Sequence, residues 1–244
     1  MDSPINLYSG LESAEHCRRL GWGGVCAALE YGGGFRKAYE DAKSPGDGML
    51  VAAVLTKSIQ RDARRAMDSA DLVIADCRSD DSCREASESW EVDLMVNAEL
   101  TADRDMIRQR SSGLDHVMAA YMAERGIGYI VNFDNILSAG GVRRAQTAGR
   151  AAQNAMLAAK YGVNVVFACG RSSKWEARGP LDLASLGIAF GVRRNAALDA
   201  VFRNPHAYAR RANDRADPDV ILDGLVVKSW GRQEKVSKRR WGWY

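Results

Sequence analysis

Histidines and carboxylates at the ends of apolar runs are the residues that a metal-dependent hydrolase would need, converging from different strands. The chain has three histidines, His16, His116 and His206, and none of them is in a His-x-His pair. Asp76 and Asp134 follow apolar runs, but polar residues that cap strand–helix loops explain them equally well. We therefore expect no metal centre, no catalytic residue and no bound cofactor in this chain.

Two other kinds of catalytic loop are also missing from the sequence. Gly32–Gly34 is glycine-rich, but no Gly-Lys-Ser/Thr follows it, so a tight or flexible turn explains it better than a phosphate loop. No Gly-x-Ser-x-Gly nucleophile elbow is present. The five cysteines form no Cys-x-x-Cys pair, which favours reduced thiols in a cytoplasmic protein. We expect neither a secretion signal nor a membrane segment.

A loop rich in cations offers a different chemistry. The segment from Cys169 to Pro180 contains Arg171, Lys174, Arg178 and Trp175 just before a helix that starts with proline. Arginine binds phosphate with paired hydrogen bonds, and tryptophan can stack on a nucleic-acid base. These residues predict an RNA-binding loop; a solvated loop with Trp175 packed on the protein is the alternative.

A second group of cations lies on a long predicted helix. Arg143, Arg144 and Arg150 are in its first half, and Arg143 and Arg150 are two turns apart, so we expect them on one face. Such a stripe either contacts the phosphates of RNA or is only a solvated face. The charge of the whole chain is +3, but residues 1–105 carry −8 and residues 106–244 carry +11. This asymmetry favours contact with a polyanion unless folding interleaves the two halves.

The elements that would position these residues alternate along the chain. Short, nearly continuous apolar runs indicate buried parallel strands, with helical segments between them. The predicted strands are Ile5–Tyr8, Gly24–Leu29, Met49–Leu55, Leu72–Ala75, Val92–Val96, Ile127–Asn132 and Val163–Ala168. The predicted helices are Leu11–Leu20, Phe35–Ala42, Ser58–Ser69, Asp80–Ser89, Leu114–Arg125, Gly141–Tyr161 and Pro180–Phe190. Seven regularly spaced strands favour an α/β TIM-like barrel over an open sheet.

The end of the chain differs from the rest. We predict a single barrel domain over residues 1–223 and an appendage over residues 224–244. We predict that the segment Lys235–Tyr244 is a contact element for nucleic acid or for a partner protein, because cations lie beside aromatic rings in it. These residues are Lys238, Arg239, Arg240, Trp241, Trp243 and Tyr244. The alternative is that the rings fold back onto the barrel.

Several segments, in order, resemble the ribonuclease P protein component 3 of archaea, the family of the 30-kDa ribonuclease P subunit. The resemblance covers about residues 106–230. It is carried by Arg110–Met118, Tyr129–Phe133, Leu157–Val163, Ser172–Ala184, Asn204–Pro205 and Gly224–Val227. Two places depart from the family pattern: Asn6–Tyr8 stands where a polar remnant is common, and Ala168–Arg171 stands where Thr-Ser-Gly-Ala is common.

The resemblance implies a barrel related to the PHP metal phosphoesterases that has lost its metal site. It implies that the chain binds and supports a catalytic RNA, which uses Mg²⁺ and removes the 5′ leader of precursor tRNA. The implied protein partners are a small RRM-like subunit and other ribonuclease P proteins, and precursor tRNA is contacted indirectly. A free-standing metal phosphoesterase and a pure protein-interaction scaffold remain the alternatives.

If the chain is such a subunit, its selected residues are expected to have one of two roles, RNA binding or structural. The expected RNA-binding residues are Arg110, Arg143, Arg144, Arg150, Lys160, Arg171, Lys174, Trp175, Arg178, Lys238, Arg239 and Arg240. Ser112, Asp115, His116 and Asn132 are expected to be structural. Ser112 and Asp115 are three residues apart, the spacing of a capping box at a helix start.

Overall fold

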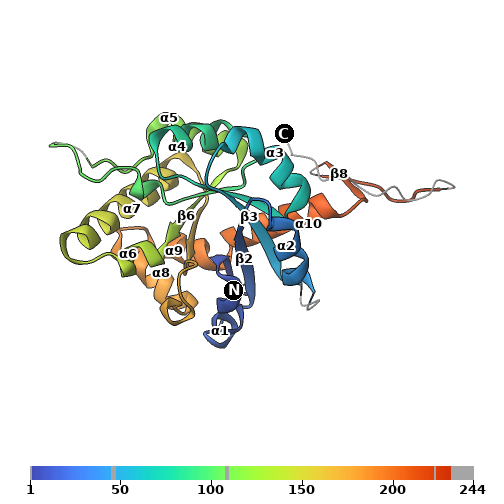
Figure 1. The fold of residues 1–244 in the computed structure, drawn as a ribbon, viewed down its shortest axis with the longest axis horizontal. Helices are drawn as coiled ribbons and strands as arrows, with labels where there is room; N and C mark the ends of the chain where they lie inside the picture. Colours follow the sequence, from blue (N-terminus) through green and yellow to red (C-terminus); the bar gives the residue numbers. More distant parts are fainter. Residues whose placement is uncertain (1, 45–47, 108–109, 223, 232–244) are drawn as a thin grey trace.

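Seven parallel strands form a nearly closed barrel in the computed structural model, which describes residues 2–44, 48–107, 110–222 and 224–231 (Figure 1). The strands are β1 (Ile5–Ser9), β2 (Gly24–Glu30), β3 (Leu50–Leu55), β4 (Leu72–Asp76), β5 (Leu94–Val96), β6 (Gly128–Asn132) and β7 (Val165–Ala168). Each strand pairs in parallel with the next one along the chain. The predicted fold class and all seven predicted strands are confirmed.

The first and last strands meet through a short contact. Ser9 and Gly170 form a parallel bridge, and the Gly170 amide donates to the Tyr8 carbonyl at 3.1 Å. The buried Asn6 side chain extends this contact, because its Oδ1 accepts from the Cys169 amide at 3.3 Å. An amide side chain on β1 thus takes the place of a backbone ladder at the junction of the barrel.

Helices cover the outside of the barrel. They are α1 (Ala14–Arg19), α2 (Phe35–Lys43), α3 (Ile59–Ser69), α4 (Asp80–Glu88), α5 (His116–Arg125), α6 (Phe133–Ser138), α7 (Gly141–Tyr161), α8 (Pro180–Ala189), α9 (Arg194–Phe202) and α10 (Asn204–Ala216). Short 3₁₀ helices η1 (Leu11–Ser13), η2 (Ala98–Leu100) and η3 (Lys174–Glu176) lie in the loops. The seven predicted helical segments are present, whereas α6, α9 and α10 were not predicted.

The core has two layers on opposite sides of the strands. Larger side chains such as Trp22, Met67, Tyr129 and Phe167 pack between the strands and the surrounding helices. The inside of the barrel is filled by alanines and by Leu, Val and Ile side chains, together with two tyrosines. A seven-stranded barrel is narrow, so one layer of side chains occupies its interior.

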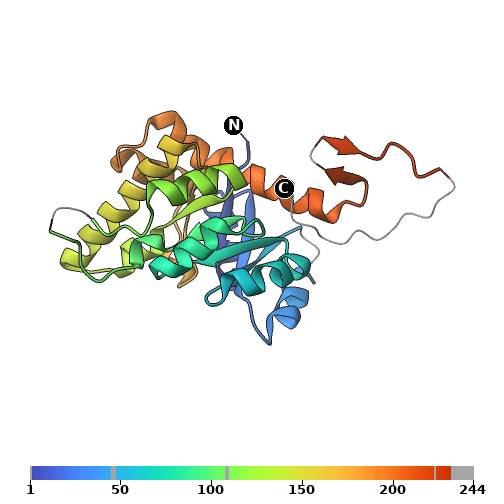
Figure 2. The same ribbon diagram turned by 90° about the horizontal axis from the view of Figure 1, so that it is seen from above.

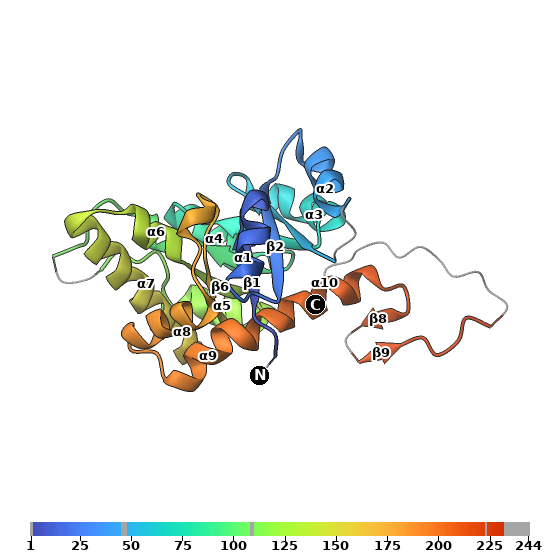
Figure 3. The same cartoon turned by 90° about the horizontal axis from the view of Figure 1, so that it is seen from below.

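The last helix of the barrel, α10, covers the amino-terminal ends of the strands (Figure 3). Its Tyr208 packs into the interior layer of the barrel. Its Arg215 forms a buried ion pair with Asp93 just before β5, at 2.7 and 2.8 Å. Asp93 also accepts from the Val73 amide at 2.9 Å, and therefore joins β4 to the covering helix. This face of the barrel is closed by apolar and charged contacts alike.

The segment that carries the family resemblance begins its helix later than expected. Asp115, not Ser112, is the N-cap of α5, and its Oδ1 accepts from the amides of Val117 and Met118 at 2.9 and 2.8 Å. The predicted capping box is therefore wrong. The helix starts later because Gly113, with a φ of +79°, turns the chain before it. Ser112 is instead buried, and its carbonyl accepts from the Asn154 side chain.

The new cap position carries a stability prediction. Asp115→Ala is expected to lower the free energy of unfolding by about 1 kcal/mol, because two amides of the first turn lose their acceptor. Asp115→Asn keeps an acceptor and is expected to lose less than half as much. Urea unfolding of both variants checks this, and equal losses for Ala and Asn would contradict the cap assignment.

A small hairpin follows the barrel and stands beyond the end of α10 (Figure 2). Its strands β8 (Val220–Leu222) and β9 (Leu225–Val226) pair antiparallel, across the domain boundary predicted at residue 223. The terminal segment predicted as a contact element, Lys235–Tyr244, lies outside the described residues. Among the helices of the described part, none combines the length and apolar character needed to cross a membrane.

Candidate functional site

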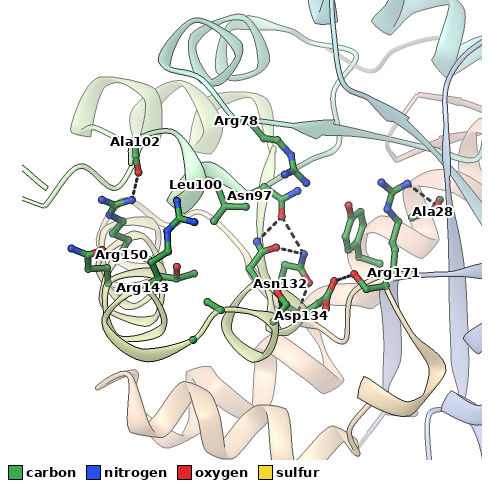
Figure 4. Close-up of a pocket in the computed structure, with 18 of the residues that line it drawn as sticks. Ala28, Arg78, Asn97, Leu100, Ala102, Asn132, Asp134, Arg143, Arg150 and Arg171 are labelled. Carbon is green, nitrogen blue, oxygen red and sulfur yellow. Dashed lines mark hydrogen bonds between the residues drawn. The ribbon is translucent and has the colours of Figure 1, made fainter. Parts of the chain in front are cut away.

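A cleft of about 930 Å³ opens at the carboxyl ends of the strands, the end where barrel enzymes place their active sites. Arg78, Arg143 and Arg171 approach it from three sides, and Asn97, Asn132 and Asp134 form its floor (Figure 4). Arg78 follows β4, Arg143 lies in the first turn of α7, and Arg171 follows β7. The cleft therefore collects polar and cationic groups from separate parts of the chain.

The floor is a network of amides. Asn97, held at φ +66°, donates to Asp76 at 2.6 Å, and Asp76 also accepts from Arg78 at 3.1 Å. Asn97 in turn accepts from Asn132 at 3.1 Å and from Asn135 at 2.8 Å. Asp76 is thus held by an amide and a guanidinium, not used as a helix cap; α4 is capped by Ser79. Asn132 is the N-cap of α6, and its side chain accepts from the Asp134 amide.

Beneath the floor lies a fully buried carboxyl group. Glu99 accepts from the Tyr129 hydroxyl and from the Asn135 amide, both at 2.7 Å. Burial raises the pKa of Glu99, and the two donated hydrogen bonds offset only part of that rise. Asn154 from α7 donates to the Tyr129 oxygen at 3.2 Å. This network joins η2, α6, β6 and α7, and it fixes the positions of these side chains beneath the cleft.

The loop after β7 is held to the same floor. Gly170 has φ +104°, and a Cβ at this position would lie 2.3 Å from the Asp134 Cβ. Ser172 Oγ donates to Asp134 Oδ2, and the Glu176 carboxyl lies against that of Asp134. Burial and this neighbouring carboxylate raise the pKa of Glu176. The loop is therefore ordered by contacts with the barrel, although it was predicted only as a cationic segment.

The predicted RNA-binding residues of this loop differ in exposure. Trp175 is 72% exposed, with Lys174 over its ring at 5.0 Å and His16 against its edge. Arg178 is half-buried, lies over the Phe133 ring and donates to the carbonyls of Trp175 and Ala177. Lys174 and Trp175 are thus exposed to solvent, whereas Arg178 stabilises the loop itself.

Arg171 is turned inward from the loop. Its guanidinium lies 5.4 Å from the centre of the Tyr8 ring and 3.6 Å from Glu30. Burial raises the pKa of Tyr8 to about 12, so this phenol stays neutral beneath the cation. Arg171 therefore belongs to the wall of the cleft and not to the exposed edge of the loop.

The expectation that Arg143 and Arg150 share an exposed face is wrong for Arg150. Arg150 is 4% exposed, pairs with Asp105 at 2.7 Å and donates to the carbonyls of Glu99 and Ala102. Residues 99–105 fold over this part of α7 and enclose the Arg150 side chain. Arg143 remains exposed at the cleft, with Asp103 3.5 Å away.

The remaining predicted cations of this region lie outside the cleft lining. Arg144 donates to the carbonyls of Leu137 and Ala139 at the end of α6. Arg110 donates to the Gly149 carbonyl at 3.4 Å, and Lys160 is exposed near the other end of α7. His116 is exposed at the start of α5. Of the predicted cations, the structure thus brings Arg143, Arg171 and the buried Arg150 to the cleft lining, whereas Arg110, Arg144 and Lys160 lie outside it.

Three cleft residues were not selected from the sequence: Arg78, Asn97 and Asn135. Asn97 directly follows the apolar run that ends at Val96, and this position at the end of a predicted strand is a signal that could have identified it. Arg78 follows β4 by two residues and gives no such signal. Among the described residues, no group of three or more His, Cys, Asp or Glu side chains is placed to hold a metal ion.

Comparison with known proteins agrees with this fold. The family model of RNase P subunit p30 matches residues 11–217. Ribonuclease P protein component 3 of Methanosarcina acetivorans is 30% identical over 118 residues, 48% of each chain. The same component of Methanosarcina barkeri is 27% identical over 163 residues, 67% of this chain and 64% of the relative. The matches thus span about half to two thirds of the length of these relatives.

Solved structures show the same architecture. A chain in the cryo-EM structure of archaeal ribonuclease P with mature tRNA has a TM-score of 0.75 at 18% identity, covering 94% of this chain and 99% of that one. A prolidase crystal structure has a TM-score of 0.55 at 12% identity, covering 93% and 78%. At these identities the likeness concerns the fold alone. The family model spans most of the barrel and the cleft, and the chain therefore belongs to the RNase P subunit p30 family.

Proposed function

We propose that this chain is a protein subunit of ribonuclease P, the enzyme that removes the 5′ leader from precursor tRNA. The observation that carries the proposal is the family match over residues 11–217. In this role the chain binds and supports a catalytic RNA, and the chemistry comes from the RNA with its Mg²⁺ ions. The chain itself contributes no catalytic residue and binds no cofactor.

The surface chemistry supports a role in RNA binding. Lys174 and Trp175 project from the loop after β7, and Arg143 projects from the start of α7. An exposed ring beside cations suits stacking on unpaired bases with neutralisation of the adjacent phosphates. A base can reach the Trp175 ring without any change in the core, because the ring is exposed.

The proposed assembly includes protein partners. By family resemblance these are a small RRM-like subunit and other ribonuclease P proteins, and precursor tRNA is contacted through the assembly. The proposed compartment is the cytoplasm. The hairpin β8–β9, with Ile221, Leu225 and Val226 exposed at 52%, 52% and 58%, is one surface available to a protein partner.

Reconstitution tests the proposed function directly. The full chain is mixed with the ribonuclease P RNA and the remaining protein subunits of the same source, and release of the 5′ leader is measured with and without it. We expect cleavage to fall strongly when this chain is omitted. Equal cleavage without the chain, or chelator-sensitive hydrolysis of RNA by the chain alone, would favour the alternative readings.

Trp175 offers a sharper test of the contact surface. Trp175→Ala is expected to weaken RNA binding by about tenfold, because base stacking on an aromatic ring contributes about 1–3 kcal/mol. Trp175→Tyr keeps a ring and is expected to retain most of the affinity. The melting temperature should change little, since the side chain is 72% exposed. An unchanged affinity of Trp175→Ala across a salt titration would show that the ring makes no RNA contact.

A further inference from the structure

The cleft at the carboxyl ends of the strands has a side built for an anion. The amino terminus of α7, a helix of 21 residues, lies in its wall, with Gly140 as N-cap and Arg143 in the first turn. The first amides of a helix have no partner within the helix, and the helix dipole favours negative charge there. No acidic residue occupies this first turn.

Two glycines leave these amides accessible. A Cβ on Gly140 or Gly141 would meet nothing within 4 Å among the described residues, so the space over the helix start is open. Gly141 has φ +51°, a conformation that side chains other than glycine rarely adopt. A bulky group can therefore approach the backbone here closely, as anions do at glycine-rich helix starts.

An independent observation comes from Arg150, which lines the same cleft two turns further along α7. The side chain is 4% exposed, and its Nη2 has no hydrogen-bond partner among the described residues. Its Nε and Nη1 are already paired with Asp105 and with two carbonyls. A buried guanidinium N–H without an acceptor is costly, and an entering anion provides the acceptor.

Three carboxylates lie at the cleft: Asp134 is in the floor and accepts from Ser172, and the other two are exposed beside arginines. Asp103 is 95% exposed and 3.5 Å from Arg143, and Glu30 is 72% exposed and 3.6 Å from Arg171. Ion pairs exposed to this extent are weak, so a doubly charged anion can displace the carboxylate from its arginine. Asp103 is in effect a competitor for the position that an anion would take beside Arg143.

We infer that this cleft is a phosphate-binding site, in which a phosphate group binds at the amino terminus of α7 and at Arg143. The cleft volume of about 930 Å³ exceeds the size of a free phosphate and accommodates a nucleotide. The phosphate donor that we favour is an RNA strand, and this identity rests on the proposed function. The site itself rests only on the geometry of the cleft.

Two substitutions with opposite expected effects on phosphate affinity test the site in the full chain. Arg143→Gln is expected to weaken binding about tenfold, because charge-assisted hydrogen bonds to phosphate are lost. Asp103→Asn is expected to strengthen binding severalfold, because it releases Arg143 from its competitor. Glu88→Gln, at the exposed far end of α4, makes the same charge change as Asp103→Asn away from the cleft and is expected to change nothing.

Calorimetric titrations with adenosine monophosphate, adenosine and a single-stranded RNA of about ten nucleotides distinguish the sources of the phosphate. Binding of adenosine monophosphate but not adenosine, with the expected order of variants, supports a site for free nucleotides. The same order seen only with the RNA supports a strand phosphate. If Arg143→Gln and Asp103→Asn both bind adenosine monophosphate and the RNA with the affinity of the wild type, the proposed phosphate site is wrong.

The proposed function is judged separately by reconstitution. If the chain supports leader removal while both variants bind as the wild type does, the site is wrong and the function stands. If the variants follow the expected order while omission of the chain leaves cleavage unchanged, the site stands and the function is wrong.

Discussion

Arg215→Ala is expected to lower the free energy of unfolding by about 3–5 kcal/mol, because it leaves the Asp93 carboxylate buried with an incomplete set of partners. Asp93 is fully buried and Arg215 is 2% exposed, with two hydrogen bonds between them. Arg211 also contacts Asp93 at 3.2 Å, but its side chain is 26% exposed. Urea unfolding followed by circular dichroism measures the loss.

Two comparisons show whether the buried pair is the cause. Arg211→Ala is expected to cost clearly less than Arg215→Ala, because Arg215 keeps the carboxylate paired. The double variant Asp93→Leu with Arg215→Leu is expected to recover part of the loss, since apolar replacement of both partners removes the unpaired charge. Equal stability of Arg215→Ala and the wild type would show that the pair contributes nothing.

The same pair predicts a dependence on pH. Burial alone would raise the pKa of Asp93, but the charges and hydrogen bonds of Arg215 and Arg211 hold it below its ordinary value. A lowered pKa in the folded state stabilises the protein above the ordinary value of about 3.9, and this contribution is lost as the pH falls toward the folded pKa. Asp93→Asn should therefore show a shallower loss of stability below about pH 4 than the wild type.

Gly170→Ala is expected to lower the free energy of unfolding by about 2–4 kcal/mol, from a strained φ and from overpacking. The added Cβ would lie 2.3 Å from the Asp134 Cβ and 2.7 Å from Asn132 Oδ1. Because Gly170 also forms the bridge to Ser9, the change acts at the junction of the barrel and at the cleft floor together. The melting temperature should fall, and the rate of leader removal in the reconstituted enzyme should fall as well.

Gly33→Ala is the matched control for this change. A Cβ at Gly33 meets nothing within 4 Å among the described residues, so the substitution is expected to be neutral or slightly stabilising. A Gly170→Ala protein as stable and as active as Gly33→Ala would show that the junction adapts without cost.

The sequence predicted the strands well because each is buried on both faces. Residues 50–55 and 72–75, for example, have no polar member, and such runs indicate parallel strands whatever surrounds them. The helix α10 was missed for the opposite reason. Most of its residues are polar. Its buried members, Pro205, Tyr208, Ala212 and Arg215, are recognisable as a core face only once the barrel end that they cover is known.

The candidate site divides in the same way. Asn132 was named from the family resemblance, and Asp134 was noted because it follows an apolar run, but it was explained equally well as a polar cap of a strand–helix loop. The burial of Arg150 could not be predicted from helical spacing, since it depends on residues 99–105 folding over α7. The N-cap of α5 was predicted at Ser112 instead of Asp115, because the positive φ of Gly113 cannot be inferred from the sequence alone.

The sequence by itself therefore determined the order of the strands, the family and the cationic character of the second half of the chain. These properties follow from local residue patterns and from their order along the chain. Only the tertiary structure decided which cations meet at one cleft and which are enclosed by the protein. Arg78, Arg143 and Arg171 are far apart in sequence, and their proximity arises from the closure of the barrel, which no local pattern encodes.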